Sequence, residues 1–203
     1  MKHVAPSTIR RLSLYRHFLE VCVDVGRPTV SSGALAEAVG ATPAQVRKDL
    51  SFFGSFGRRG VGYAAGDLAE HLREILGLGR SYRVVLVGGG RLGAALVHLE
   101  GFRSRGFEIV AVYDTDPAEV GAVLDGLTVR EGARLESDLE AQPADIGVIG
   151  VPPAEAQAVA DRLVRAGVRA LLNFAPVHLR VPAGVSVKHV NLALELDGLA
   201  FAL

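Results

Sequence analysis

Val84-Val-Leu-Val-Gly-Gly-Gly-Arg-Leu-Gly93 is the stretch that organises the rest of the chain. A short apolar run, predicted as a buried parallel strand over Tyr82–Val87, leads into glycines that fit the pattern G-x-G-x-x-G. In this motif the first glycine turns the chain off the strand. The second lets backbone approach a pyrophosphate, and the third lets a helix pack closely on the sheet. The candidate cofactor-binding residues of this stretch are Gly88, Gly89, Gly90, Arg91, Leu92 and Gly93.

The residues after the glycines continue the pattern of a dinucleotide-binding fold. Leu92, Leu96 and Leu99 recur at helical spacing, and Phe107–Tyr113 is predicted as a second strand. Asp114 follows, 21 residues after the last glycine, where the fold places an acid on the adenosine ribose. Such an acid accepts a hydrogen bond from a 2′-OH and repels a 2′-phosphate, which favours NAD(H) over NADP(H). The alternative is a related fold with another ligand or none; the order of strand, glycines, helix, strand and acid weighs against it.

Further predicted strands complete an α/β domain with a parallel sheet. They cover Ile146–Val151, Ala170–Pro176 and Pro182–Val190, with a helix over Ala154–Ala166 and a hairpin turn at Asp125-Gly126. In doubly wound folds, ligands lie outside the carboxyl ends of the strands. The residues that this rule places around a nicotinamide are Val151, Pro152, Asn173 and Phe174.

The N-terminal part of the chain predicts a helix-turn-helix. A first helix begins with Ser7 as its cap, and its apolar face is Ile9, Leu12, Tyr15, Leu19 and Cys22. A second helix begins at Val30–Ser32, and Gly40–Thr42 forms a tight turn. Thr42-Pro43 then starts a third helix, which in this motif reads DNA. The candidate DNA-binding residues here are Ser32, Gln45, Arg47, Lys48 and Ser51.

Gly54–Tyr63 predicts a tight β-ribbon, or wing, after the third helix. It carries Arg58 and Arg59 at its tip, where they are able to enter a minor groove or clamp phosphates. Arg47 and Lys48 alone would fit a merely solvated helix face. Since helix and wing repeat the same charge, the DNA-binding interpretation is preferred.

Length and composition limit the domain organisation, the partners and the kinds of site that the chain can have. The 203 residues predict a winged-helix domain at 1–78, a Rossmann domain at 79–190 and a final helix at 191–203. Formal net charge is zero, but residues 1–80 carry 11 Lys+Arg against 7 Asp+Glu, which suggests that only this half meets a polyanion. One cysteine excludes an intramolecular disulfide and a cysteine-based metal cluster, and no metal is expected. Without a long apolar run or a signal peptide, the chain is expected to be cytoplasmic.

The last segment carries a stripe of leucines at Leu192, Leu196, Leu199 and Leu203. On a terminal helix such a stripe either packs on its own domain or forms a dimer contact. A dimer would suit a DNA-binding protein, because two helices must read two half-sites.

Three blocks of sequence resemble the Rex family of bacterial redox-sensing transcriptional repressors. The first is QVRKDLSFFGSFG at Gln45–Gly57, followed by Gly60–Tyr63. The second is the glycine stretch with Tyr113-Asp114, and the third is Leu172–Pro176. The resemblance implies a homodimer that binds operator DNA, with the final helix exchanged between subunits. It also implies NADH and NAD⁺ as effectors: NADH binding releases the operator, whereas NAD⁺ leaves the protein able to bind DNA.

The chain departs from the family pattern at His17, Leu99 and Asn191, where an arginine, a tyrosine and an aspartate are expected. In the family these three residues form a polar network that joins winged helix, cofactor domain and exchanged helix. Here the network lacks the acid and the phenol, so the resemblance implies an altered NADH response with little effect on fold or DNA binding.

Two other classes of function, a dehydrogenase and a CoA-binding module, fit the sequence less well. A small NAD-dependent dehydrogenase needs a substrate domain and an acid or base near the nicotinamide. The short tail after the Rossmann core cannot cover a substrate, and no motif ties His98, His178 or His189 to a reacting group. A CoA-binding module opens with similar glycines, but Asp114 and the winged helix argue against it. The chain is therefore not expected to be an enzyme.

Overall fold

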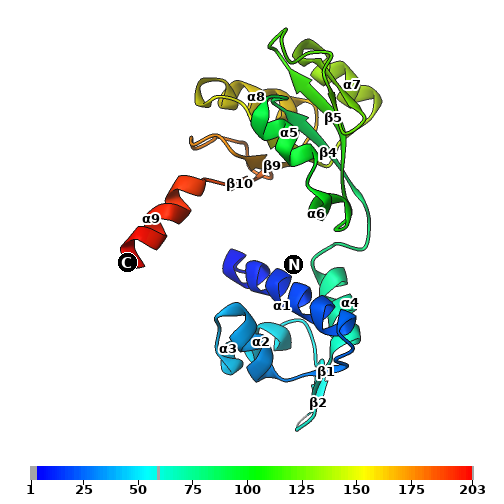
Figure 1. The fold of residues 1–203 in the computed structure, drawn as a ribbon, viewed down its shortest axis with the longest axis vertical. Helices are drawn as coiled ribbons and strands as arrows, with labels where there is room; N and C mark the ends of the chain where they lie inside the picture. Colours follow the sequence, from blue (N-terminus) through cyan, green and yellow to red (C-terminus); the bar gives the residue numbers. More distant parts are fainter. Residues whose placement is uncertain (1–3, 59, 203) are drawn as a thin grey trace. The chain divides into compact units, whose positions relative to one another are not determined.

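The computed structural model describes residues 4–58 and 60–202, and the side chains of all of these except Ala202. The chain divides into two compact units, Met1–Arg80 and Ser81–Leu203, called unit 1 and unit 2 below (Figure 1). Of the helices in these described residues, none is both long and apolar enough to span a membrane.

Unit 1 is a helical domain with a small antiparallel sheet (Figure 1). Its helices are α1 (Pro6–Asp24), α2 (Ser32–Val39), α3 (Pro43–Ser51) and α4 (Ala65–Ile75); its strands are β1 (Thr29–Val30), β2 (Gly57–Arg58) and β3 (Gly62–Ala64), in the order β1-β3-β2. Gly40 ends α2 in the left-handed conformation (φ 66°), which glycine adopts without strain, and this lets α3 begin three residues later. The predicted helix-turn-helix and wing are thus present.

The core of unit 1 is assembled from apolar residues spaced at three and four along each helix. Leu12, Tyr15 and Leu19 of α1 are buried, and they pack with Val46 and Leu50 of α3. Ile9, predicted to share this face, is 46% exposed because it lies in the open first turn of α1. Arg16 is instead among the buried residues of α1.

One of the three predicted helix caps, Ser7, was wrong. No side chain caps α1; Ala5 holds the cap position and Pro6 opens the helix, so Ser7 already lies inside it. In α2 the cap is Ser31, whose Oγ accepts a hydrogen bond from Ala34 N at 3.1 Å. Thr42 caps α3 as predicted, with Oγ1 accepting from Gln45 N at 3.1 Å.

Unit 2 is a doubly wound sheet with helices on both faces. In its described residues the strands are β4 (Tyr82–Val87), β5 (Phe107–Asp114), β6 (Val123–Leu124), β7 (Leu127–Glu131), β8 (Ile146–Ile149), β9 (Ala170–Asn173) and β10 (Ser186–His189). Their order is β10-β9-β8-β4-β5-β7-β6, and all neighbours pair in parallel except β6 with β7. Asp125 (φ 46°) and Gly126 (φ 81°) form the predicted hairpin turn between β6 and β7.

The helices of unit 2 are α5 (Arg91–Val97), α6 (Glu100–Arg103), α7 (Leu135–Ala141), α8 (Pro153–Arg165) and α9 (Leu192–Ala202), with a 3₁₀ turn η1 (Gly132–Arg134) before α7. One face of the sheet packs against α7 and α8, through residues such as Leu139 and Leu163. The other face packs against α5 and α6, through Leu96 and Phe102. Of the three leucines predicted to share a buried helix face, only Leu96 is buried, because α5 ends before Leu99 and Leu92 points outward.

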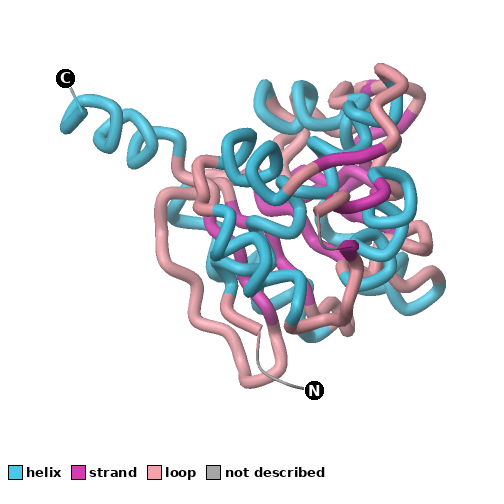
Figure 2. Tube along the Cα trace, turned by 90° about the horizontal axis from the view of Figure 1, so that it is seen from below, coloured by secondary structure: helices cyan, strands magenta, loops and turns pink. Residues whose placement is uncertain are grey.

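Helix α9 runs away from the strands of unit 2 and ends at the C terminus (Figures 1 and 2). Its large apolar side chains are exposed within the chain, including Leu192, Leu196 and Leu199 of the predicted stripe and also Leu194 and Phe201. Leu203, the fourth member of the stripe, lies outside the described residues. The three described leucines of the stripe therefore do not pack on their own domain.

Candidate nucleotide loop and nucleic-acid interface

The topology of unit 2 brings two glycine-containing strand ends together. Strand β4 is central: the chain leaves it toward β5 and β7, then returns to its other side at β8. The carboxyl ends of β4 and β8 meet there, and Gly150 N donates a hydrogen bond to Val87 O at 2.8 Å. A reversal of this kind is where open α/β sheets bind their ligands.

The fold requires glycine at two of the three motif positions. A Cβ on Gly88, where φ is +109°, would collide with the carbonyl of Gly150, and a Cβ on Gly93 would collide with the carbonyl of Gly88. At Gly90 the nearest atom to such a Cβ is Glu119 Oε1, 3.8 Å away, and φ is −63°. The chain itself therefore does not require glycine at position 90. The space beside Gly90 suits an external group that approaches the backbone closely.

Asp114 lies at the end of β5 and holds this loop. Its Oδ2 accepts a hydrogen bond from Gly89 N at 2.6 Å, and its Oδ1 accepts one from Asp116 N at 2.9 Å. The neighbouring Tyr113 is buried, and its hydroxyl donates to Asp138 Oδ2 on α7 at 3.2 Å. The position of Asp114 is thus set by backbone on one side and by the anchored Tyr113 on the other.

The other predicted cofactor residues differ in exposure and in the face of the sheet on which they lie. Arg91 and Leu92 are exposed at the start of α5, and Pro152 is exposed before α8. Val151 is half-buried against the α7/α8 face and Phe174 against the opposite face. Phe174 N donates to Ile149 O at 2.9 Å, which places the ends of β8 and β9 side by side.

Asn173 is fully buried, and its side chain is occupied within the chain. Oδ1 accepts from Ala175 N at 3.0 Å, while Nδ2 donates to Ala175 O and Val177 O at 3.0 Å. Nδ2 also lies 3.2 Å from Nδ1 of His189. The amide thus shapes the loop after β9 and leaves little hydrogen-bonding capacity for a ligand.

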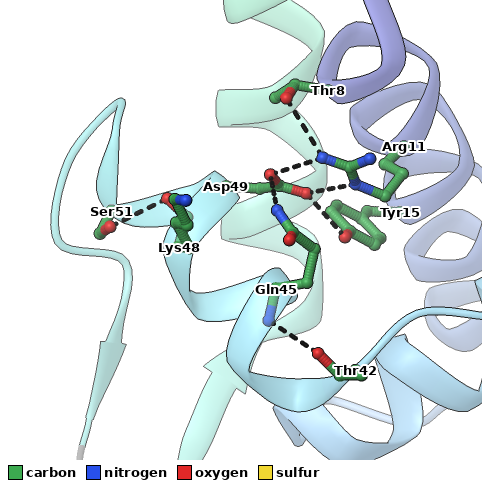
Figure 3. A network of polar contacts seen from close by, with 8 residues as sticks. All are labelled: Thr8, Arg11, Tyr15, Thr42, Gln45, Lys48, Asp49 and Ser51. Atoms are coloured by element: carbon green, nitrogen blue, oxygen red, sulfur yellow. Dashed lines mark hydrogen bonds and ion pairs between the residues drawn. The ribbon is translucent and has the colours of Figure 1, made fainter. Parts of the chain in front are cut away.

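In unit 1 a buried carboxylate joins α3 to α1 (Figure 3). Asp49 is 4% exposed and accepts four hydrogen bonds. Arg11 approaches it with two donors, Nε at 2.6 Å from Oδ2 and Nη2 at 2.8 Å from Oδ1. The Tyr15 hydroxyl donates to Oδ2 at 3.0 Å, and Gln45 Nε2 donates to Oδ1 at 2.7 Å. These residues are called the Asp49 cluster below.

The charge of the Asp49 cluster is stabilised by its donors. Burial alone would raise the pKa of Asp49, but the hydrogen bonds from Arg11, Gln45 and Tyr15 outweigh it and hold this pKa below its ordinary value. Burial, with the hydrogen bond to Asp49, raises the pKa of Tyr15 to about 12. The cluster is therefore an ionised carboxylate facing a guanidinium and a neutral phenol.

Adjacent residues of α3 point to solvent. Arg47 and Lys48 are exposed, and Arg47 Nη1 donates to Ser32 Oγ at 3.1 Å. Ser51 is exposed, with its hydroxyl donating to Lys48 O at 3.0 Å. Gln45, predicted to face outward with them, is half-buried because its amide belongs to the Asp49 cluster.

A hollow of about 530 Å³ lies between α3 and the wing. Arg47, Ser51 and Ser32 line it from the helices, and Arg58 and Val61 line it from the wing. Arg59, the other predicted tip residue, lies outside the described residues. Exposed guanidinium groups on two sides of one hollow match the chemistry that holds a phosphate backbone.

Sequence reasoning missed Asp49, Arg11 and Tyr15 as the support of α3. A signal was present: Asp49 falls within the inward spacing of Val46 and Leu50, where a carboxylate requires a buried partner. The identity of that partner, 38 residues away, could not be read from local spacing.

A winged helix-turn-helix followed by a doubly wound unit with a nucleotide-type glycine loop defines a DNA-binding transcriptional regulator. Comparison with known proteins agrees. The family described as "Putative DNA-binding protein N-terminus" matches residues 3–51, and the family described as "CoA binding domain" matches residues 80–177. The redox-sensing transcriptional repressor Rex of Desulfitobacterium hafniense is 48% identical over 98% of this chain and 94% of its own length. That of Carboxydothermus hydrogenoformans is 47% identical over 98% and 95%.

Solved structures show the same relationship. The crystal structure of RSP in complex with β-NAD⁺ and operator DNA matches with a TM-score of 0.93 and 35% identity, covering 100% of this chain and 93% of that one. The structure of RSP with β-NADH matches with a TM-score of 0.91 and 33% identity, covering 100% and 95%. The chain belongs to the Rex family of redox-sensing transcriptional repressors. This family consists of repressors, so the dehydrogenase alternative is set aside.

Proposed function

We propose that this chain binds operator DNA as a cytoplasmic homodimer and releases it when NADH occupies unit 2. One observation carries the proposal: over its whole length, the chain has the fold of a repressor solved with operator DNA and β-NAD⁺ and, separately, with β-NADH. DNA binding is assigned to residues 1–78, the nucleotide to 79–190 and dimer contact to 191–203. NADH and NAD⁺ act here as effectors and undergo no reaction.

The nucleotide is assigned to the glycine loop and the strand ends around it. Open space beside Gly90 suits the pyrophosphate, next to the N–H groups that begin α5. Asp114 retains lone pairs beyond its two backbone bonds and borders the ribose. Val151, Pro152 and Phe174 border the nicotinamide, while Asn173 shapes the loop beside it.

The DNA is assigned to the exposed residues of α3 and the wing. Lys48 is the proposed base reader, since its exposed ammonium lies on the helix that enters the major groove. Arg47, Ser32, Ser51, Arg58 and Arg59 are proposed to hold the backbone and to set the register of the helix. Gln45 is assigned a supporting role through Asp49.

The exposed apolar side chains of α9 support a dimer in which this helix is exchanged. A hollow of about 490 Å³ on unit 2, lined by Phe102, Val148 and Leu172 among others, offers apolar surface for such a contact. His17 and Leu99 are exposed within the chain, and Asn191 Oδ1 accepts from Ala193 N at 3.1 Å at the start of α9. The acidic and phenolic groups of the family network are missing at these positions. We therefore expect a given concentration of NADH to release a smaller fraction of the bound DNA than in relatives that retain them.

The test is fluorescence anisotropy on an inverted-repeat duplex selected from a random pool, at one salt concentration because phosphate contacts dominate affinity. NADH, NAD⁺, CoA and no ligand are compared side by side. Release by NADH alone supports the proposal. DNA binding that no nucleotide alters would show that the switch has been lost, and release by CoA would assign unit 2 to that ligand instead.

A further inference from the structure

A second carboxylate, Glu119, borders the glycine loop. It is half-buried, and its Oε1 is the nearest atom to a Cβ placed on Gly90, at 3.8 Å. Within the described part of the chain, this carboxylate makes no hydrogen bond or ion pair. A charged group therefore stands beside the open space of the loop with all its acceptor capacity free.

The backbone that presents Glu119 is tightly held. Asp116 Oδ1 accepts from Ala118 N at 2.9 Å, and Asp116 O accepts from the N–H groups of Glu119 and Val120 at 3.0 Å. Asp114 in turn holds Asp116 N. The turn after β5 is thus built on the same acid that borders the ribose, and it brings Glu119 to the loop from the ribose side.

The two neighbouring acids are already committed to backbone. Each oxygen of Asp114 already accepts one backbone hydrogen bond, from Gly89 N or Asp116 N, and one oxygen of Asp116 accepts a bond within its own turn. A ribose bound beside this loop would find Glu119 as the carboxylate that accepts no hydrogen bond from the described residues of the chain. Its hydroxyls are donors to such a group, whereas a 2′-phosphate would place additional negative charge against it.

We propose that Glu119 is a specificity-determining residue of the nucleotide site, accepting a hydrogen bond from the adenosine ribose and excluding nucleotides that carry a 2′-phosphate. The inference rests on the proposed binding of NADH and assigns to Glu119 much of the discrimination that sequence reasoning gave to Asp114 alone. The chain would then distinguish NADH from NADPH with two acids, one holding the loop and one facing the sugar.

The test titrates NADH and NADPH into the full-length chain, following nucleotide fluorescence, for wild type and Glu119→Gln. The amide keeps an acceptor and the shape but removes the charge. We expect the ratio of the NADPH to the NADH dissociation constant to fall about tenfold, mainly through tighter NADPH binding, since like charges in such proximity repel by about this amount. The change should shrink in concentrated salt, which screens charges at a surface.

Glu108→Gln is the matched control, since Glu108 is exposed near the opposite end of β5 and should leave the ratio unchanged. Glu119→Lys should lower the ratio further than the amide does. An equal gain for both nucleotides in Glu119→Gln would mean that Glu119 merely repels the pyrophosphate, and an unaltered ratio would deny it any part; either overturns the inference. Wild-type chain that binds no NADH would overturn the proposed function itself.

Discussion

Two carboxylates, Asp49 and Asp114, hold the two working regions of this molecule in different ways. Asp49 is buried, and its four hydrogen bonds come from three side chains on two helices. Asp114 is half-buried, and both of its donors are backbone N–H groups: that of Gly89, 25 residues away in the glycine loop, and that of Asp116, two residues away in the turn after β5. The first joins two helices through side chains, whereas the second orders the backbone of a loop and a turn.

Because of this difference, we expect Asp49 to affect mainly stability and Asp114 to affect mainly binding. Removing a buried carboxylate that joins helices leaves its guanidinium partner unpaired, so such a change lowers the free energy of unfolding. A carboxylate that orders a loop at the edge of a sheet affects mainly what the loop binds. Breaking each in turn should therefore damage a different property of the protein.

The largest effect is expected for Asp49→Ala. Loss of the carboxylate leaves the buried Tyr15 hydroxyl and the partly buried Arg11 guanidinium without their acceptor, and we expect unit 1 to lose about 3–5 kcal/mol of stability. Hydrogen exchange of the α1 and α3 amides in the full chain measures this locally. Asp24→Ala, an exposed acid at the end of α1, is the matched control and should change little. Equal protection in both variants would mean that the Asp49 cluster does not hold α3.

Acid should reproduce part of this loss. Because the pKa of Asp49 is lower in the folded chain than in the unfolded chain, its contribution is present above the ordinary carboxyl pKa of about 3.9 and is lost as pH falls below it. Asp49→Asn should flatten this dependence for the α1 and α3 amides. A wild-type and an Asn variant with parallel pH profiles would contradict the assignment of charge to Asp49.

Much of unit 2 was predictable because its signals are local. The strand before the glycines was predicted with its observed bounds, and the hairpin turn at Asp125-Gly126 was correct. Helix α7 and strand β7 were missed, since neither has strong periodicity of its own. Strand β8 stops at Ile149 and β9 at Asn173, earlier than predicted; after β9 the Asn173 side chain bonds to Ala175 and Val177 and shapes a loop instead.

The supporting contacts could not be predicted in the same way. Asp49 pairs with a residue 38 positions away, and Glu119 reaches Gly90 only through the shape of a turn. Gln45 has the chemistry of a base reader, yet a carboxylate one helical turn onward holds its amide. Residue type and spacing predicted that Arg47, Lys48 and Ser51 are exposed, but the partner that draws Gln45 inward depends on packing.

The next largest effect is expected for Gly93→Ala. The new methyl would collide with the Gly88 carbonyl, so either the loop or α5 must shift, and we expect a loss of about 1–3 kcal/mol in unit 2 together with loss of NADH binding. Thermal unfolding and calorimetric titration measure the two effects. Gly101→Ala is the control, because nothing lies within 4 Å of its Cβ position. A Gly93 variant that still binds NADH normally would show that close packing of α5 is not needed.

Lys48→Ala should weaken operator binding by about 1–3 kcal/mol and relax base preference, without changing stability, because this exposed side chain makes no supporting contact like those of Asp49. Anisotropy with operator and scrambled duplexes separates specific from general loss. Arg10→Ala, an exposed cation on α1, is the control. An equal loss on both duplexes would reassign Lys48 to the phosphate backbone.

Asp114→Ala should cost less stability than Asp49→Ala and should have a clear effect on nucleotide choice. Its removal leaves the N–H groups of buried Gly89 and exposed Asp116 without their acceptor, so we expect about 1–2 kcal/mol of lost stability. NADH affinity should fall about tenfold as the loop loosens and an acceptor is lost, and the gap to NADPH should narrow. Asp114→Asn, which keeps one acceptor oxygen, should lie between. Unchanged NADH affinity in the alanine variant would remove Asp114 from the ribose and leave Glu119 as the acid of that corner. A stability loss as large as that of Asp49→Ala would instead show that the loop carries as much of the fold as the helix junction does.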